Sequence, residues 1–221
     1  MHRVSVYIFL VLLFLGLSTS SRTSNQEIPY IASEQAISQI VHGAPVTVIL
    51  VDIFQAGFLI KTYYHKYSVV QPYKQPETMI VRTSSQFWRA NQNNLGMALF
   101  SRDEKNNDES FIPAPPGMLF IGNPSYGNWV LQNSGEREWI FHHIYKHFYR
   151  VLGWGNFRPS LKFYELAKIN LSNSQIFYGP ENEFGTNGKV TGITLARSES
   201  QRSSHEIKIM NHLKKFIGLS H

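Results

Sequence analysis

The ten residues from Pro45 to Phe54, PVTVILVDIF, restrict the fold more than any other part of this 221-residue chain. Apart from Thr47 and Asp52 they are apolar, and most are β-branched. Successive side chains of a strand point to opposite faces, so a strand without polar alternation is apolar on both faces. Other elements must then cover it on both sides. We therefore expect a layered fold built around this strand.

Further strands are predicted on both sides of a polar loop at residues 91–94. The segment FLIKTYYHKYSVVQP, residues 58–72, follows the turn at Ala56-Gly57 and is expected to form a hairpin with the strand 45–54. A short helix is predicted before them, from the N-cap Ser33 to the terminating Gly43. The remaining predicted strands are residues 78–83, 96–101 and 118–121.

Beyond Asn133 the pattern favours helices. Asn133 and Glu136 resemble a capping box that opens a helix ending at Gly153. Two more helices are predicted at residues 159–171 and 203–218, and the Asn187-Gly188 turn predicts a strand at 189–195. The fold class expected is therefore α+β: a β-rich N-terminal half with an antiparallel or mixed sheet, packed against two or three C-terminal helices.

The first 20 residues are predicted to be a secretory signal peptide. Met1, His2 and Arg3 precede an apolar run of about 14 residues and a small-residue segment ending at Ser20. Cleavage there leaves a single exported domain of residues 21–221, with a possible β-rich subregion 45–132 and an α-rich subregion 133–221. The alternative is an uncleaved N-terminal anchor. The expected location is periplasmic or secreted.

The absence of cysteine excludes disulfides, cysteine-ligated zinc and thiol nucleophiles. About 200 residues can bury a sufficient core without a disulfide. The chain is basic, with 21 Lys and Arg against 15 Asp and Glu. Nucleic acid is not expected as a partner of an exported protein, so the basic charge favours a cell-wall glycan, an envelope protein or the head groups of a membrane surface. Alternatively, it serves solubility alone.

Three histidines occur in the segment HHIYKH, residues 142–147. If this segment is helical, His143 and His147 lie four residues apart on one face and could ligate zinc. The glutamate of the His-Glu-x-x-His motif is missing, because Ile144 follows His143. The alternative interpretation places both histidines at the border of a packed helix face. No cofactor is expected in that case.

Two kinds of side chain are candidates for binding a ligand. His142, Lys146 and Arg150 are spaced four by four and would form a basic ridge on the other helix face. Two aromatic loops, GNPSYGNW and GWGNFRP, either fill the core between the two halves or line an exposed groove. Their candidate ligand-binding residues are Tyr126, Trp129, Trp154 and Phe157.

Three carboxylates are candidates for catalysis. Glu181 and Glu183 lie in the loop YGPENEFGTNG and could form the carboxyl pair that glycosidic cleavage requires. Asp52 is the single charge in the strand 45–54 and is either bound to nearby backbone or part of a site. The chain carries no serine-hydrolase elbow, no phosphate-binding loop and no calcium loop.

Three hypotheses for function follow. The first is an exported, non-catalytic binding protein of the cell envelope that uses basic helix faces and aromatic loops on an anionic glycan or a protein partner. The second is a cell-wall hydrolase of the metal-dependent or two-carboxylate type. The third is a structural or assembly factor without a small ligand.

Overall fold

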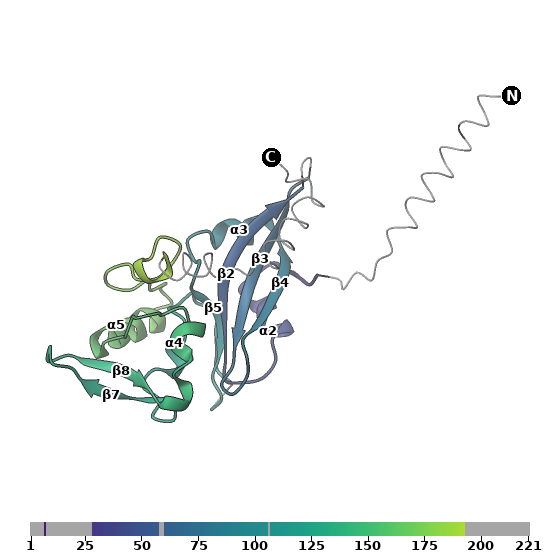
Figure 1. The fold of residues 1–221 in the computed structure, drawn as a ribbon. Coiled ribbons are helices and arrows are strands. Elements are labelled where there is room, and N and C mark those ends of the chain that lie inside the picture. Colours follow the sequence, from purple (N-terminus) through teal and green to yellow (C-terminus); the bar gives the residue numbers. More distant parts are fainter. Residues whose placement is uncertain (1–6, 8–27, 58–59, 106, 193–221) are drawn as a thin grey trace, which may run out of the picture.

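The fold is α+β, with a curled, mixed six-stranded sheet in its N-terminal half (Figure 1). The computed structural model describes residues 28–57, 60–105 and 107–192, together with Tyr7. The strand order is β1-β4-β3-β2-β5-β6; β1 pairs with β4 in parallel and all other pairs are antiparallel. The strands are β1 (Tyr30–Ile31), β2 (Val46–Ala56), β3 (Thr62–Val70), β4 (Glu77–Thr83), β5 (Ala98–Arg102) and β6 (Glu109–Ser110).

Strand β2 confirms the prediction that both of its faces are covered. From Val46 to Leu50, five consecutive side chains are between 0 and 4 % exposed. Helix α2 (Glu34–Ile40) contributes the buried Ile37, and Val41 follows at its C-cap. The short helix α3 (Ser85–Ala90) begins where the Ser84 hydroxyl accepts a hydrogen bond from the Phe87 amide, 3.0 Å away.

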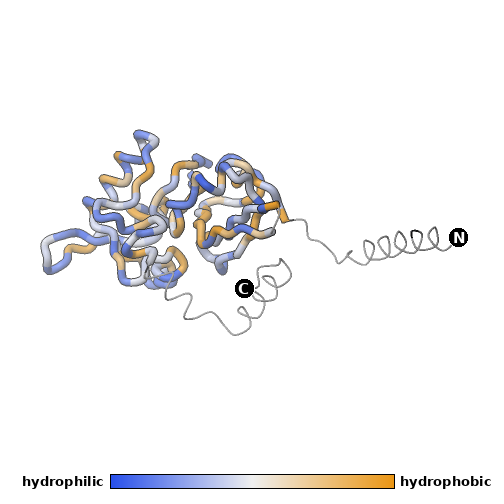
Figure 2. The backbone as a smooth tube through the Cα atoms, turned by 90° about the horizontal axis from the view of Figure 1, so that it is seen from above, coloured by the Kyte–Doolittle hydropathy of each residue, from blue (hydrophilic) through white to orange (hydrophobic). Residues whose placement is uncertain are grey.

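The C-terminal part lies on the β5 side of the sheet (Figure 1) and holds short elements joined by turns. Strands β7 and β8 form an antiparallel hairpin, whose turn is the hydrophilic tip that projects from the tube in Figure 2. Ser160 is the N-cap of helix α5, and its hydroxyl accepts a hydrogen bond from the Phe163 amide. The elements are η1 (Met118–Phe120), β7 (Gly127–Leu131), β8 (Arg137–Phe141), η2 (His143–Tyr145), α4 (Phe148–Val151) and α5 (Leu161–Ser172).

Aromatic rings fill the core of this C-terminal part. Phe141 stacks on Trp154 with 5.2 Å between ring centroids and meets Phe148 edge to face at 5.3 Å. Phe163 and Phe184 continue the packing through Phe157. Each aromatic ring buries a large apolar area, so a region with little regular secondary structure still gains a substantial core.

The prediction of one helix from Asn133 to Gly153 is wrong. Residues 127–141 form the β7–β8 hairpin instead, and the Gln132 amide donates to the Glu136 carbonyl across its turn at 2.8 Å. Trp139 and Phe141 alternate with less buried neighbours, which is the period of a strand. Glu136 therefore lies in a turn and caps no helix. The division between subregions 45–132 and 133–221 falls inside this turn.

Two smaller predictions also fail. The predicted strand 118–121 contains the 3-10 helix η1, which begins after Gly117 in a left-handed conformation, φ 78°. Residues 189–192, predicted as the start of a strand, are helical, and the Gly192 amide donates to the Gly188 carbonyl. By contrast, the helix after Ser33, the first hairpin, the strands near 78–83 and 96–101, and the helix near 159–171 are all confirmed.

Two predicted elements lie outside the described residues. These are the signal peptide, of which only Tyr7 is described, and the helix 203–218. Within residues 28–57, 60–105 and 107–192, no helix has the length and apolarity needed to cross a membrane.

His65 is buried in the sheet, and no charged residue of the described part of the chain forms an ion pair with it. Its side chain is 0 % exposed, and Nδ1 shares a 2.8 Å hydrogen bond with the Tyr67 hydroxyl. Phe87 of α3 packs against the imidazole with 5.2 Å between ring centroids. Burial lowers the pKa of His65 to about 4, because a charged imidazole loses its hydration there. The folded protein therefore holds this histidine neutral.

This burial predicts a specific loss of stability in acid. The unfolded chain binds a proton at His65 near its ordinary pKa of 6.5, whereas the folded chain does so only near 4. Stability should therefore fall as the pH drops from 6.5 towards 4 and lose nothing more from this group below that. Between pH 7 and pH 5, the loss in unfolding free energy should be about 2 kcal/mol larger for the wild type than for His65→Gln.

Urea denaturation at both pH values measures this difference. Comparison with the variant removes the contribution of every other titrating group. An identical pH dependence in the two proteins would contradict the burial of a neutral His65.

Candidate functional site

Three strand-end segments meet at one end of the sheet and, together with Leu119 and the turn at residues 123–126, line a cavity of about 550 Å³. Because β2 is antiparallel to both β3 and β5, the start of β2 lies beside the ends of its two neighbours: Val46 pairs with Arg102 and Thr47 with Val70. The segments before β2, after β3 and after β5 therefore converge. The lining residues are Gly43–Pro45, Gln71–Lys74, Asp103–Lys105, Leu119 and Asn123–Tyr126.

Two tyrosines of this lining give it an aromatic wall, and we call it the tyrosine cavity. Tyr73 lies at its surface, 79 % exposed, and its hydroxyl accepts a short hydrogen bond from the hydroxyl of Tyr145 in η2. Tyr126 is buried and meets Tyr145 edge to face, with 5.1 Å between ring centroids. The ring of Tyr73 is thus exposed while its hydroxyl is held in place.

Tyr126 and Tyr145 remain protonated near neutral pH. Burial, and the negative charge of Glu104 next in weight, raise the pKa of Tyr126 to about 12. Burial also raises the pKa of Tyr145, and its hydrogen bond to Tyr73 adds to that effect. The phenols can therefore donate and accept hydrogen bonds, but they are poorly suited to act as bases.

The charges that line the tyrosine cavity balance. Asp103 and Glu104 contribute two carboxylates, and Lys74 and Lys105 contribute two ammonium groups. The Lys74 ammonium donates to Gln71 Oε1 at 3.0 Å, which keeps this lysine along the wall. A cavity with no net charge favours ligands through hydrogen bonds and ring contacts rather than through overall attraction.

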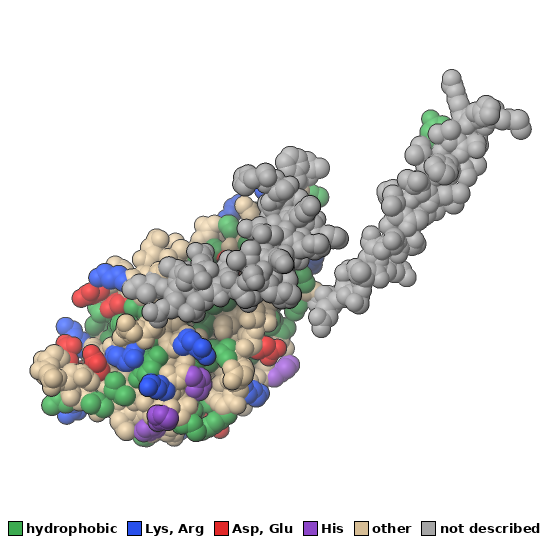
Figure 3. All heavy atoms as spheres, in the orientation of Figure 1, with side chains coloured by type: hydrophobic (Ala, Val, Ile, Leu, Met, Phe, Trp, Pro, Cys, Tyr) green, Lys and Arg blue, Asp and Glu red, His purple; other side chains and the backbone are tan. Residues whose placement is uncertain are grey.

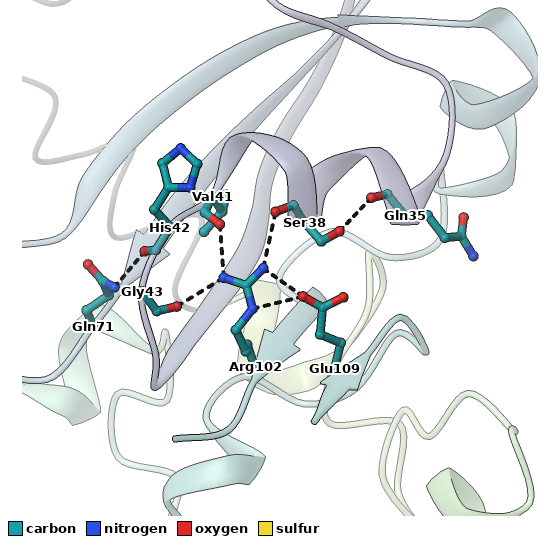
Figure 4. Close-up of polar contacts among 8 residues, drawn as sticks. All are labelled: Gln35, Ser38, Val41, His42, Gly43, Gln71, Arg102 and Glu109. Atoms are coloured by element: carbon teal, nitrogen blue, oxygen red, sulfur yellow. Dashed lines mark hydrogen bonds and ion pairs between the residues drawn. The ribbon is translucent and has the colours of Figure 1, made fainter. Parts of the chain in front are cut away.

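Arg102 holds the wall of the cavity in place (Figure 4). Its Nη1 donates to the carbonyls of Val41 and Gly43 at 3.0 and 3.1 Å, and its Nη2 donates to the carbonyl of Ser38 at 3.1 Å. The carboxylate of Glu109 accepts from Nε and Nη2 at 2.8 and 2.7 Å. One guanidinium therefore ties the end of α2 and the segment before β2 to the β5–β6 hairpin.

A second contact fixes the neighbouring wall. Gln71 Nε2 donates to the carbonyl of His42 at 3.0 Å, so the turn after β3 is attached to the segment before β2. Together with Arg102, this contact orders all three strand-end segments that form the cavity.

The four predicted aromatic residues lie in different surroundings. Tyr126 lines the tyrosine cavity. Trp154 is 2 % exposed, and its indole donates to the Pro116 carbonyl at 3.0 Å. Phe157 is half-buried against Phe163 and Phe184. Trp129 is also half-buried and meets both Trp139 and Tyr164.

The predicted metal and basic residues lie on short helical turns rather than on one long helix. His143 begins η2 and His147 precedes α4, and both are exposed. Among the described residues, no three His, Asp or Glu side chains come together as a metal-binding group. The half-buried His142 does not belong to an exposed ridge, since its Nε2 donates to the Pro124 carbonyl at 2.9 Å.

Lys146 and Arg150 are exposed and form no ion pair within the part of the chain that the structure describes. Figure 3 shows Lys, Arg and His side chains close together where Figure 1 draws α4 and the end of β8. We call the surface of Lys146 and Arg150 the cationic strip; the exposed His143 and His147 lie close to them in the sequence. Lys146 follows directly after Tyr145, whose ring contacts Tyr73 and Tyr126 of the cavity lining.

The candidate carboxylates have structural partners. Glu183 accepts from the Glu181 amide at 2.9 Å, and the carboxylate of Glu181 forms an exposed ion pair with Lys189 at 3.0 Å. Neither glutamate lines the nearby cavity of about 420 Å³ formed by Asn93, Tyr178, Asn182 and the loop 184–188. Asp52 is half-buried on β2, opposite Lys66 of β3.

Several residues of the tyrosine cavity were not expected from the sequence. Tyr73 lies in the turn QPYKQP, and Asp103 to Lys105 belong to the polar segment RDEKNNDES, which reads as a solvated loop. The one sequence feature that points to this site is the position of Tyr73 between two prolines, Pro72 and Pro76. Pairing of the strands was needed to bring these loops together.

Comparisons with protein-family models, with curated proteins and with solved structures give no match. The geometry and charge of the cavity and the strip are therefore the basis for assigning a function.

Removal of the Arg102 side chain should destabilise the protein. Arg102→Ala leaves the partly buried carbonyls and Glu109 without their donor, so the unfolding free energy should fall by about 2 kcal/mol. Glu109→Gln should cost less, because the amide oxygen still accepts a hydrogen bond. Urea denaturation at pH 7 measures both.

Arg89→Ala is the matched control, since Arg89 is exposed on α3 and should change stability by less than about 0.5 kcal/mol. An Arg102→Ala variant no less stable than Arg89→Ala would show that the guanidinium does not secure the wall.

Proposed function

We propose that this protein is an exported, non-catalytic binding protein of the cell envelope that holds an anionic wall glycan. The observation that carries the proposal is the cationic strip beside the tyrosine cavity. Lys146 and Arg150 are exposed and lack acidic partners in the described part of the chain, so their charge is available to an outside anion. The cavity supplies a concave surface next to this charge.

The composition and the N-terminal segment support the same proposal. The chain carries a formal net charge of +6. The basic start and the apolar run of residues 4–17 favour export, which places the protein among anionic wall polymers. Lys146 follows directly after Tyr145, which contacts both cavity tyrosines, and this link supports a polymer that reaches both surfaces.

Binding to purified wall glycan should depend on salt and on the strip. Lys146→Gln combined with Arg150→Gln should weaken binding about tenfold at low salt, because two favourable charges are lost. At about 0.5 M salt the wild type should bind as weakly as this double variant, since screening removes the same attraction. Co-sedimentation with the insoluble glycan measures the bound fraction.

Lys61→Gln combined with Arg89→Gln is the matched control. It removes the same net charge from two exposed positions near the turn between β2 and β3 and on α3, far from α4 in Figure 1. Equal weakening by both double variants would show that only the net charge of the protein matters. It would contradict glycan binding at the cationic strip. Binding that ignores salt would argue for an uncharged glycan or a protein partner instead.

A further inference from the structure

We infer that the tyrosine cavity binds a neutral sugar unit of the glycan, while the cationic strip contacts the anionic groups of neighbouring units. This inference rests on the proposed function and assigns separate tasks to its two surfaces. Recognition of the neutral sugar in the cavity is then separate from the electrostatic contact at the strip.

The aromatic wall supplies the first part of the chemistry. A sugar ring presents a face of C–H groups, which packs well on an aromatic ring. Tyr73 offers such a ring: it is 79 % exposed, lines the cavity and has its hydroxyl held by Tyr145. A ring already fixed in position loses little conformational entropy when a ligand stacks on it.

The polar lining supplies the second part. Sugar hydroxyls act as both donors and acceptors, so they need partners of both kinds. Asp103 and Glu104 accept hydrogen bonds, Lys74 and Lys105 donate them, and Asn123 can do both. The lining therefore offers the mixture of donors and acceptors that a neutral sugar needs.

Charge distinguishes the cavity from the strip. Two carboxylates and two ammonium groups leave the cavity lining with no net charge. An anionic unit placed there would gain no net electrostatic attraction, because Asp103 and Glu104 offset Lys74 and Lys105. On the strip, Lys146 and Arg150 have no carboxylate paired with them in the described residues. The neutral unit therefore belongs in the cavity and the anionic groups belong on the strip.

The size and the order of the cavity also fit this assignment. Its volume of about 550 Å³ is within the range of sites that bind small ligands. Arg102 and Gln71 fix the segments that form its walls, so the cavity exists before the ligand arrives. Exposed loops without such contacts would have to be ordered on binding.

Isothermal titration calorimetry with three neutral oligosaccharides tests the inference. The probes are maltotetraose, cellotetraose and chitotetraose, each at concentrations up to about 1 mM. At least one should bind the wild type, with an affinity that changes little between low salt and about 0.5 M salt. Tyr73→Ala should weaken this binding about tenfold, whereas Tyr73→Phe, which keeps the ring, should retain most of it.

Two controls separate this inference from the proposed function. Tyr30→Ala removes another exposed tyrosine, on β1, and should leave oligosaccharide binding unchanged. Lys146→Gln combined with Arg150→Gln should bind the neutral oligosaccharide as the wild type does, while its binding to the wall glycan at low salt falls about tenfold. Circular dichroism of each variant confirms that it is folded.

The outcomes are distinct. If no neutral oligosaccharide binds, or if Tyr73→Ala binds as tightly as the wild type, the inference is overturned, and salt-dependent binding of wall glycan through the strip can still stand. If a neutral oligosaccharide binds at Tyr73 but the strip variant keeps its hold on the wall glycan, the cavity assignment stands and the anionic contact of the proposed function fails.

Discussion

The burial of both faces of β2 between Val46 and Leu50 is the constraint on which the rest of the structure depends. The side chains of Val46 to Leu50 are shielded from water, so the backbone there must be satisfied by neighbouring strands and the side chains must be covered by layers on either side. Strands β3 and β5 provide the hydrogen bonds. Their antiparallel direction then brings the loops before β2, after β3 and after β5 to the same end of the sheet. The tyrosine cavity is a direct result of this pairing.

The electrostatics of the two binding surfaces differ because their surroundings differ. Asp103 and Glu104 project from a loop that also carries Lys105, so opposite charges stay close and largely cancel. Lys146 and Arg150 lie in short helical turns that pack on aromatic rings. No carboxylate of the described residues forms an ion pair with either of them. The aromatic core thus leaves the charge of the strip uncompensated.

Local patterns in the sequence predicted the sheet well and the C-terminal part poorly. The segment 45–54 identified its own strand, because β-branched residues without alternation have few other stable arrangements. The segment after Asn133 was wrongly predicted as a helix because Asn133 and Glu136 resemble a capping box. The alternation of Trp139 and Phe141 instead indicates a strand. In that region the packing of aromatic rings overrides local propensity.

The site was harder to predict than the fold. Tyr126 is a sequence candidate because it is an aromatic residue in a turn, and it lies in the cavity. Trp154 is a candidate for the same reason, but it is buried. Sequence alone does not distinguish these two cases, because exposure depends on which distant segment packs against each ring. Tyr73 and Asp103 are about 30 residues apart and become neighbours only through the register of the sheet.

The Arg102 contacts also determine how this region can open. Since one guanidinium on β5 joins the last turn of α2 and the segment before β2 to the β5–β6 hairpin, none of the three can leave its place without breaking hydrogen bonds of Arg102. These elements therefore form one unit of local unfolding with a shared opening free energy. A ligand that binds only the closed cavity would then protect the amides of α2 from hydrogen exchange, although the helix does not touch it.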